Sequence, residues 1–497
     1  MQHTPRSPGR ALAWLIAGTT LLRLGFAAAV GLGVDESYMV TAGRVLSLGY
    51  FDHPPASWWL SWGAAHLAGT ESAVVVRLPF IALFALSTWL MARLASAVAD
   101  ERAGFWAAVL LNLSPVFGIT TGTWVLPDGP LDCALIAAAL CLAHALPAQG
   151  SAAWRWWSGA GLCVGLALFS KYSAILTMAG AFAYLMFSAR HRFWLRRPQP
   201  YCAAVLAGLV FSPVIIWNAT HGWASFAFQG DRATGLRFRP LAPLETLGGE
   251  ALFVLPWIWL PMMLLFARAL RPAHPDWRDR LLACLAAPPV IGFALISAWS
   301  SRRILFHWAA PGYLMLFPLL GRAVAQHIHL PWVRRVIGGT AALAIAAVSV
   351  IGLQTRFDIL GPVLTAVTRK DPTIEGVNWT SLRADLRQRG LLPPGAVVGV
   401  PNWRDAGKIG FGLGPDVTVL CLCRDARQFA FAHPPAAHVG QDMLLLSMDP
   451  PDRAAASFAP LFRTLTPLAP APVMLRGRTL HQVSVLSGDT LLAWPPR

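Results

Sequence analysis

The sequence predicts a polytopic α-helical membrane protein that ends in a soluble, extracytoplasmic domain of α/β type. Three observations carry this prediction: 56% of the 497 residues are apolar, only 13% are charged, and the apolar residues form long runs separated by short basic or proline-rich breaks. A soluble protein is about one-quarter charged, and the mean hydropathy of this chain is +0.52. The composition therefore excludes an ordinary soluble enzyme.

The first apolar run follows Arg6 and Arg10, and no small-residue cleavage site comes after it. We therefore interpret it as a retained anchor rather than a signal peptide. A helix needs roughly 20 apolar residues to cross a bilayer, and about eleven runs approach that length. The predicted spans are residues 11–30, 73–98, 104–121, 131–146, 157–170, 172–188, 201–217, 250–270, 281–299, 308–324 and 336–353. Residues 1–353 are thus predicted to form the transmembrane domain.

The basic residues indicate how these spans are oriented. The chain has 40 lysines and arginines against 24 aspartates and glutamates, a net charge of +16. Up to about Arg335 they are almost all arginines in short connections, and three arginine-rich connections fall on one side if the spans alternate: residues 191–200, the segment after Leu270, and the segment before the last span. The positive-inside rule makes this side cytoplasmic. No nucleic-acid-binding motif accompanies the charge, and we expect no nucleic-acid partner.

The character of the chain changes after Leu353. A helical pattern covers residues 380–389, and short apolar segments bounded by proline, glycine and aspartate predict strands at 396–400, 417–421, 443–446 and 483–486. Residues 354–497 are therefore predicted to be a soluble α/β domain on the periplasmic side. Cys421 and Cys423 are too close in sequence to suggest an ordinary disulfide framework.

Acidic residues are scarce, so those beside predicted membrane boundaries are informative. The first external loop carries Asp35, Glu36 and Asp52, with His53 after the last of these and several tryptophans following. A carboxylate next to an apolar span is costly unless it lines a hydrated cleft. The alternative is that these are solvated loop charges with tryptophans anchored in the headgroup belt.

A second acid, Asp128, lies in a Pro/Gly turn between two spans on the same external side, and Asp132 follows shortly after. A negative charge is favoured at the start of a helix. A turn and a helix cap are therefore an equal alternative to a functional role.

Cations are predicted on the same external face. Lys171, one of three lysines in the chain, lies next to Tyr172 between two apolar spans, and snorkelling at the interface is its simpler explanation. Arg302, Arg303 and His307 break the positive-inside pattern. A phosphate at the outer headgroup level would explain this break, because arginine binds phosphate oxygens bidentately.

External carboxylates and external cations suit the transfer of a sugar from a polyprenyl phosphate. A carboxylate can take the acceptor's proton as general base, and cations can stabilise the departing phosphate.

The motifs also resemble a known family. They are Asp35-Glu36 with a nearby tyrosine, Gly49-Tyr50 through Asp52-His53-Pro54-Pro55, Pro127-Asp128-Gly129-Pro130, Ser170-Lys171-Tyr172-Ser173, Trp217 through Phe226, and His307-Trp308 before Pro311 and Tyr313. In this order, over about the first 350 residues, they resemble bacterial members of the family 39-like GT-C glycosyltransferases. This group is akin to the protein O-mannosyltransferases and to the aminoarabinose transferase that modifies lipid A.

The resemblance implies a GT-C fold and a polyprenyl-phosphate sugar donor, with undecaprenyl phosphate expected, used with inversion on the outer side of the bacterial inner membrane. It implies that Asp35 is the catalytic base and that Asp128 is the acid of the second external loop, and Glu36 is grouped with them as catalytic. Lys171 and the Arg302-Arg303 pair are the candidate ligands of the donor phosphate.

The remaining substrate-binding candidates are Asp52, His53, Tyr172 and His307. His53 departs from the pattern of the lipid A transferases, which carry a lysine before the Pro-Pro of this loop. A neutral imidazole binds phosphate less well than an ammonium group does, so the acceptor, whether lipid, glycan or protein, stays open.

We expect no obligatory metal or other cofactor. A divalent cation is the alternative, because acidic and histidine side chains could hold one; these are Asp35, Glu36, Asp52, His53 and His307.

Two other functions compete with glycosyl transfer. A transporter or lipid flippase would show internal repeats and ionisable groups near the bilayer midplane, whereas here no repeat is evident and the acids cluster at one face. A catalytically idle scaffold is the other, and the retained Asp35 and Asp128 argue against it.

Overall fold

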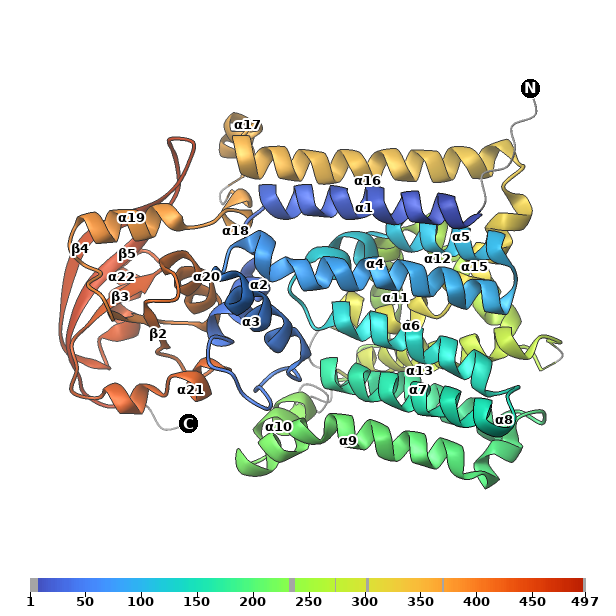
Figure 1. Ribbon diagram of the computed structural model, residues 1–497. Coiled ribbons are helices and arrows are strands. Elements are labelled where there is room, and N and C mark those ends of the chain that lie inside the picture. The colour runs from blue at the N-terminus through green and yellow to red at the C-terminus, as the bar shows by residue number, and fades with distance from the viewer. Residues whose placement is uncertain (1–7, 232–236, 273, 301–303, 369–370, 495–497) are drawn as a thin grey trace. The chain divides into compact units, whose positions relative to one another are not determined.

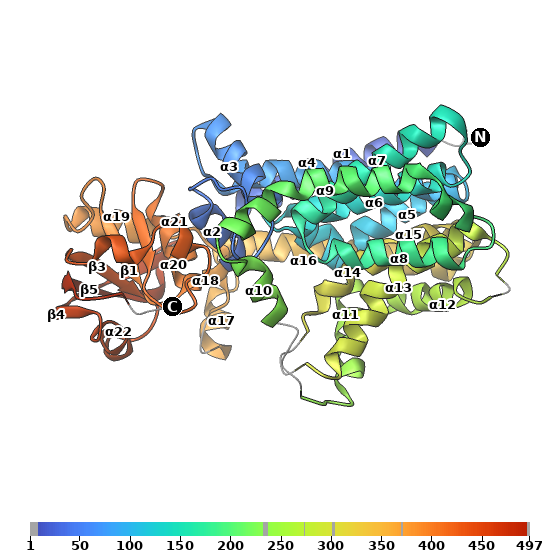
Figure 2. The ribbon, with the colours of Figure 1, turned by 90° about the horizontal axis from the view of Figure 1, so that it is seen from below.

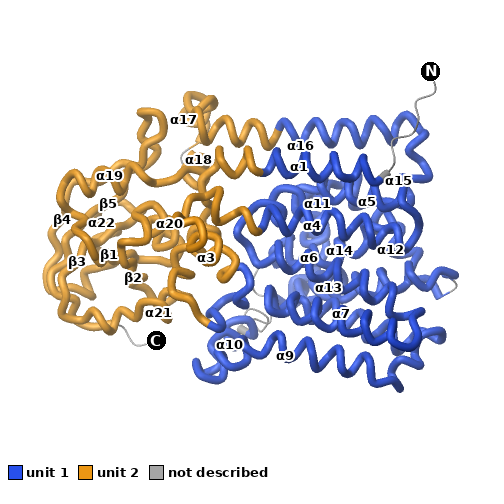
Figure 3. The backbone as a smooth tube through the Cα atoms, in the orientation of Figure 1, with its two compact units in different colours: residues 1–23, 48–57, 80–346 blue, residues 24–47, 58–79, 347–497 orange. Residues whose placement is uncertain are grey.

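The computed structural model describes residues 8–231, 237–272, 274–300, 304–368 and 371–494. They form two compact units, drawn in different colours in Figure 3. Unit 1 comprises residues 1–23, 48–57 and 80–346, and unit 2 comprises residues 24–47, 58–79 and 347–497. Four helices have residues in both units: α1 (Pro8–Ala29), α3 (Ala56–Ala68), α4 (Ala73–Val98) and α16 (Pro331–Phe357). The division of the chain at residue 353 stays a prediction, since unit 2 also includes earlier segments.

Helices joined by loops make up unit 1, and no β-strand is found among its described residues. Figure 1 and Figure 2 show α6, α7 and α9 side by side, and α8 lies against α13. Its longer helices are α5 (Glu101–Leu113), α6 (Asp128–Ala145), α7 (Gly150–Ser170), α8 (Ala174–Phe187), α9 (Pro198–Thr220), α10 (Ala224–Asp231), α11 (Ala242–Val254), α12 (Pro256–Ala269), α13 (Trp277–Ser297) and α15 (Phe317–His327). Shorter turns are η1 (Val116–Thr121), η2 (Arg192–Arg196), η3 (Phe306–Ala309) and α14 (Ala310–Leu314).

Small residues let the helices of unit 1 approach closely. A Cβ atom at Gly161 of α7 would collide with the backbone of Ala203 on α9. In a membrane the lipid is as apolar as the side chains, so the hydrophobic effect does not drive helices together. Close van der Waals packing between helices stabilises their association instead. A polar link adds to it: the buried Arg23 donates to the carbonyl oxygen of Gly118 at 3.1 Å and to the amide oxygen of Asn112 at 3.0 Å.

Each predicted span contains helix, but fewer helices than eleven meet the requirements for crossing a membrane. Among the described residues, six helices are long and apolar enough, and the pair α11 and α12 adds a seventh if it is one span. This pair is bent by 116° at Leu255, which precedes Pro256. A proline disfavours helical geometry in the residue before it, so the predicted span over 250–270 consists of parts of two helices that meet at a bend rather than of one continuous helix. The other predicted spans are shorter, interrupted or less apolar helices.

Unit 2 contains a five-stranded sheet in the order β2-β1-β3-β5-β4. β1 (Val397–Val400) is parallel to β2 (Thr418–Cys421) and β3 (Met443–Ser447), whereas β5 (Arg478–Leu491) is antiparallel to β3 and to β4 (Phe462–Leu475). The remaining helices of unit 2 are α2 (Val34–Ala42), α17 (Gly361–Val367), α18 (Thr373–Gly376), α19 (Thr380–Gln388), α20 (Trp403–Leu413), α21 (Phe429–Ala432), η4 (Pro435–His438) and α22 (Pro451–Phe458).

The predicted helix at 380–389 and all four predicted strands are present, so the α/β type of this region is confirmed. The structure adds β4, which the pattern did not predict. This strand contains three prolines and lies at the edge of the sheet, where a residue without a backbone N–H is tolerated.

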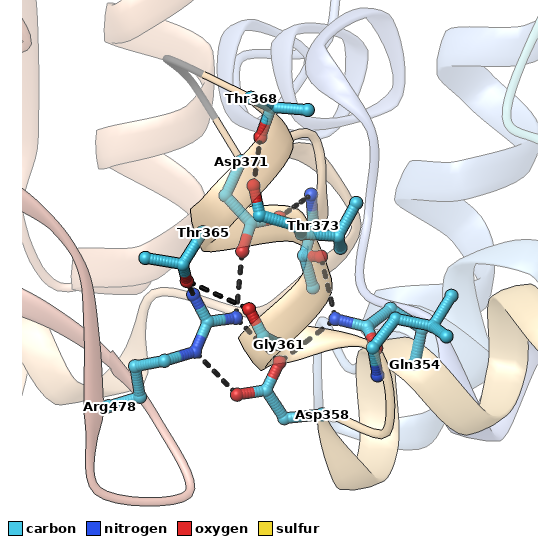
Figure 4. Close-up of polar contacts among 10 residues, drawn as sticks. Gln354, Asp358, Gly361, Thr365, Thr368, Asp371, Thr373 and Arg478 are labelled. Carbon is cyan, nitrogen blue, oxygen red and sulfur yellow. Dashed lines mark hydrogen bonds and ion pairs between the residues drawn. The ribbon is translucent and has the colours of Figure 1, made fainter.

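An arginine at the end of the long β4–β5 hairpin ties the sheet to the helices that follow α16. Arg478 binds both carboxylate oxygens of Asp358 at 2.5 Å, and it binds Asp371 at 2.7 Å (Figure 4). These hydrogen bonds hold the pKa of Asp358 below its usual value. These ion pairs attach the segment between α16 and α19 to strand β5 of the sheet.

Candidate functional site

Helix α2 of unit 2 carries Asp35 and Glu36 in its first turn, where the helix dipole favours negative charge. The helix begins after Gly33, whose backbone N–H donates to the Glu36 carboxylate at 2.9 Å. The N–H of Gly33 has no acceptor within the helix, because it lies at the helix start, and the Glu36 side chain supplies one. The segment that the sequence suggested to be a loop is therefore helical at the two candidate acids.

Glu36 is held in a buried ion pair with Arg77 of α4. The Arg77 guanidinium binds both Glu36 oxygens, at 2.8 and 2.6 Å, and donates to the carbonyl oxygens of Val30 and Gly31 at 2.6 and 2.9 Å. Arg77 is 0% exposed and Glu36 is 2% exposed. A fork-to-fork pair of this kind is both strong and geometrically specific. These contacts fix the start of α2 to the end of α1.

Lys408 of α20 is a second buried cation near this pair. Its ammonium group donates to the carbonyl oxygens of Leu32, Glu375 (2.7 Å) and Val377 (3.1 Å). Three acceptors match the three donors of a lysine. Burial lowers the pKa of Lys408 to about 7, while Glu36 acts in the opposite direction.

Helix α20 also packs closely against α2. A Cβ atom at Gly407 would lie 2.6 Å from the Cα atom of Tyr38, so only glycine fits there. The Thr41 hydroxyl donates to the carbonyl oxygen of Gly407 at 3.0 Å. The Tyr38 hydroxyl in turn accepts a bond from the backbone N–H of Gln428 at 3.0 Å. The C-terminal part of the chain therefore positions the helix that carries Asp35.

Asp35 differs from its neighbour Glu36 because its carboxylate has no direct partner in the part of the chain that the structure describes. It is exposed to solvent, and it forms neither a hydrogen bond nor an ion pair with any residue that the structure describes. Enough protein surrounds the group that desolvation raises the pKa of Asp35. Arg427 and then Arg404 act in the opposite direction and lower it. Two cations thus act electrostatically on a carboxylate that no described residue binds directly.

Unit 1 brings together a second group of predicted residues. Asp128, the first residue of α6, is buried and pairs with the Lys171 ammonium at 2.8 Å. Lys171 follows directly on the last residue of α7. His307 and His53 also interact electrostatically with the Asp128 carboxylate. The contact of α6 with α7 therefore brings Asp128 and Lys171 together, although they are 43 residues apart in the sequence.

The other candidates in unit 1 are placed as follows. The Tyr172 hydroxyl is hydrogen-bonded to the Ser225 hydroxyl at 2.7 Å. Asp52 is buried, and its backbone carbonyl accepts a bond from Gln229 at 2.6 Å. Arg302 and Arg303 lie outside the described residues. Within the described part of the chain, no group of three histidine, cysteine, aspartate or glutamate residues could hold a metal ion.

Four cations around α2 were not predicted from the sequence: Arg77, Arg404, Lys408 and Arg427. Two of them have a sequence feature that could have marked them as candidates. Arg77 interrupts an apolar run of 26 residues, and a charge inside such a run needs a partner. Lys408 is one of three lysines in the chain. Arg404 and Arg427 stand among many arginines, and the sequence offers nothing that singles them out.

Comparisons with known proteins support the predicted resemblance. A family model described as dolichyl-phosphate-mannose-protein mannosyltransferase matches residues 52–217. No curated protein sequence matches the chain. The structure of ArnT from Cupriavidus metallidurans bound to undecaprenyl phosphate is similar with a TM-score of 0.68 at 15% identity, covering 99% of this chain and 100% of that one.

Two further structures are similar to different degrees. The apo state of the same ArnT gives a TM-score of 0.66 over the same share of both chains. The S. cerevisiae protein O-mannosyltransferase Pmt1-Pmt2 complex bound to the sugar donor gives 0.37 at 19% identity, over 45% of this chain and 35% of that chain. The expected fold is confirmed: the chain is a multi-pass membrane protein with the GT-C glycosyltransferase fold and a C-terminal region that contains a sheet.

Proposed function

We propose that the protein transfers a sugar from a polyprenyl-phosphate donor to an extracytoplasmic acceptor, a lipid, glycan or protein, with inversion at the sugar. The reaction takes place on the periplasmic side of the bacterial inner membrane, and undecaprenyl phosphate is the expected carrier. The observation that carries the proposal is the contrast within one helix turn: Asp35 is exposed and has no direct partner among the described residues, whereas Glu36 is buried and paired.

Asp35 is the proposed general base. An effective base must be unprotonated, within reach of the acceptor, and not already neutralised by a bound cation. The exposed carboxylate is bound by no cation among the described residues, and desolvation makes it more basic because it raises the pKa of Asp35. Asp35 takes the proton of the acceptor hydroxyl while that oxygen forms a bond to the anomeric carbon.

The donor phosphate is proposed to bind the cationic group around Lys171. The bond between the anomeric carbon and the phosphate oxygen breaks as the new bond forms, and its electron pair leaves with the polyprenyl phosphate. Lys171 and a protonated His307 or His53 would stabilise the negative charge that develops there. Asp128 holds Lys171 in place through the 2.8 Å ion pair. Arg302 and Arg303 remain further candidates for this phosphate.

Displacement in one step from the face opposite the leaving phosphate inverts the anomeric centre. Asp52 and Tyr172 are retained as proposed substrate contacts. For Glu36 we now favour a positioning role over a catalytic one, because both of its oxygens are bound by Arg77.

The experiment that tests the function compares bacteria with and without the protein by mass spectrometry of lipid A, other envelope lipids, glycans and proteins. The proposal expects one class of molecule to lose a mass equal to that of one sugar residue. A lipid flippase would instead change where a lipid lies without removing a sugar from it, so unchanged masses in every fraction would contradict the proposal.

A further inference from the structure

Two thiols in unit 2 lie in contact outside the groups discussed so far. Cys421 ends strand β2 and Cys423 follows two residues later, and their sulfur atoms are 3.1 Å apart. Side chains two residues apart on an extended chain point to the same side, which explains the contact. Both cysteines are free in the structure.

The two thiols have different surroundings. Cys421 is buried, and desolvation raises the pKa of its thiol. Cys423 is half-buried and shares a hydrogen bond with the Cys421 thiol, and the backbone N–H groups of Asp425 and Trp403 also lower the pKa of its thiol. Trp403 is the first residue of α20, and a helix N-terminus stabilises a thiolate. The Cys421 hydrogen bond is the largest of the influences that lower the pKa of Cys423.

We propose that Cys421 and Cys423 form a redox-active dithiol that exchanges with external disulfides and closes to an intramolecular disulfide. The accessible Cys423 is the attacking thiol and the buried Cys421 is the resolving thiol. The inference goes beyond glycosyl transfer and needs only that this part of the chain meets an oxidising compartment, where disulfides persist.

The exchange balances as follows. The Cys423 thiolate attacks a disulfide, one sulfur–sulfur bond breaks, and a mixed disulfide forms while one thiolate leaves. Cys421 then loses its proton, attacks the Cys423 sulfur and releases the second thiol. Two protein thiols are oxidised and one external disulfide is reduced to two thiols. Closing the ring requires the sulfur separation to shorten from 3.1 Å to about 2.0 Å.

The position of the dithiol suggests why its state would matter. The residues that follow Cys423 reach α2, because the backbone N–H of Gln428 donates to Tyr38 and the Phe429 ring lies 5.8 Å from the Tyr38 ring. The Trp403 ring lies 5.1 Å from the same ring, and the Trp403 backbone N–H is among the groups that lower the pKa of Cys423. The dithiol is therefore part of the structure that holds α2.

A third ligand that would favour a metal site over a disulfide is not found. No group of three metal-binding side chains occurs in the part of the chain that the structure describes. A dithiol without a third ligand is better suited to disulfide exchange than to holding zinc.

The test uses the full-length protein in detergent, exposed to glutathione buffers of increasing oxidising strength and then quenched with an alkylating reagent. Trypsin cleaves after Lys408 and Arg424, so one peptide contains both cysteines. The proposal expects this peptide to become lighter by two hydrogen atoms, unalkylated, as the buffer becomes more oxidising. A second arm replaces glutathione disulfide with an oxidised protein dithiol oxidase, and faster closure there would identify a protein as the natural oxidant.

A second pair provides the matched control. Cys141 of α6 and Cys163 of α7 are also hydrogen-bonded to each other, but they lie within helices of unit 1. They are expected to stay reduced. Equal oxidation of both pairs would contradict the proposal that Cys421 and Cys423 form a specific redox site. Full alkylation of Cys421 and Cys423 in the most oxidising buffer would also contradict it.

Two variants separate the roles of the thiols. Cys421→Ser should trap Cys423 as a lasting mixed disulfide with glutathione, because no second thiol releases it. In Cys423→Ser, the remaining Cys421 should react at least about tenfold more slowly than Cys423 does in Cys421→Ser, because it is buried and not activated. Equal rates for the two variants would contradict the assignment of Cys423 as the attacking thiol.

Discussion

The two candidate carboxylates, Asp35 in unit 2 and Asp128 in unit 1, have opposite surroundings. Asp128 is buried and neutralised by the Lys171 ammonium at 2.8 Å. Asp35 is exposed and has cations near it, Arg427 and Arg404, but none bonded to it in the described structure. A paired carboxylate orients a cation, whereas an unpaired one can accept a proton. This difference supports the proposal that Asp35 is the base and that Asp128 positions Lys171.

The largest effect is expected when Asp35 loses its basicity. Asp35→Asn should lower the turnover number about 10³-fold, because a general base commonly contributes 10² to 10⁴. Donor affinity should stay unchanged, since the phosphate is assigned to other residues. Asp416→Asn is the matched control, because Asp416 pairs with Arg383 and Arg387 at the surface and is expected to leave turnover unchanged.

Breaking the buried pair of Glu36 should chiefly affect stability. Glu36→Gln leaves the Arg77 charge buried and is expected to cost about 3 kcal/mol, measured as a lowered melting temperature of the full-length protein in detergent. Glu245→Gln disrupts an exposed pair with Arg239 and should change the melting temperature little. Similar shifts for the two variants would show that the Glu36 pair does not have the assigned structural role.

The Asp128 and Lys171 pair should act as one element. Each single variant, Asp128→Asn and Lys171→Met, should lower kcat/KM for the donor about 10²-fold, because either one misplaces the phosphate-binding cation. The double variant should lose little more, as groups that act together are not additive. Steady-state kinetics of all three variants give the coupling, and additive losses would separate the two roles.

Lys408 should make stability depend on pH. Its folded pKa of about 7 lies below the ordinary lysine value of 10.5, so the unfolded chain binds more protons between these values and stability rises with pH across this window. The contribution is on the order of 1 kcal/mol per pH unit. Lys408→Met should remove this part of the slope, as seen in melting temperatures from pH 7 to pH 10. An unchanged slope would contradict the lowered pKa.

The smallest expected effect concerns Arg404, which lowers the pKa of Asp35. Arg404→Gln should let that pKa rise, so more of the carboxylate is protonated in acid. The acidic limb of the kcat/KM profile should then move to higher pH by a fraction of a unit, while activity at high pH stays the same. Arg383→Gln, which alters an arginine paired with Asp416, should leave the limb in place. A shift toward lower pH would reverse the assigned sign.

Local patterns were sufficient to predict most of the elements. The apolar runs gave the helices of unit 1, and short apolar segments between turn residues gave four of the five strands. Strand β4 was missed because its prolines mask the pattern of a strand, and the bend at Leu255 was missed although Pro256 marked it. These failures concern signals that lie within the sequence itself.

The roles of the candidate site residues depended on long-range contacts. Glu36 and Arg77 are 41 residues apart, and Lys408 donates to a carbonyl 376 residues away. No periodicity or spacing predicts such pairings. Sequence reasoning therefore identified Asp35, Asp128 and Lys171 as candidates, but only the structure distinguishes the partnered carboxylates of Glu36 and Asp128 from that of Asp35, which has no direct partner among the described residues.

The most direct test of glycosyl transfer is a reconstituted assay with a polyprenyl-phosphate-linked sugar and an extract of envelope acceptors. The wild-type protein should release free polyprenyl phosphate and add one sugar mass to an acceptor, and Asp35→Asn should release it about 10³-fold more slowly at saturating donor. Release at equal rates by the two proteins, or sugar that stays on the lipid throughout, would contradict the account.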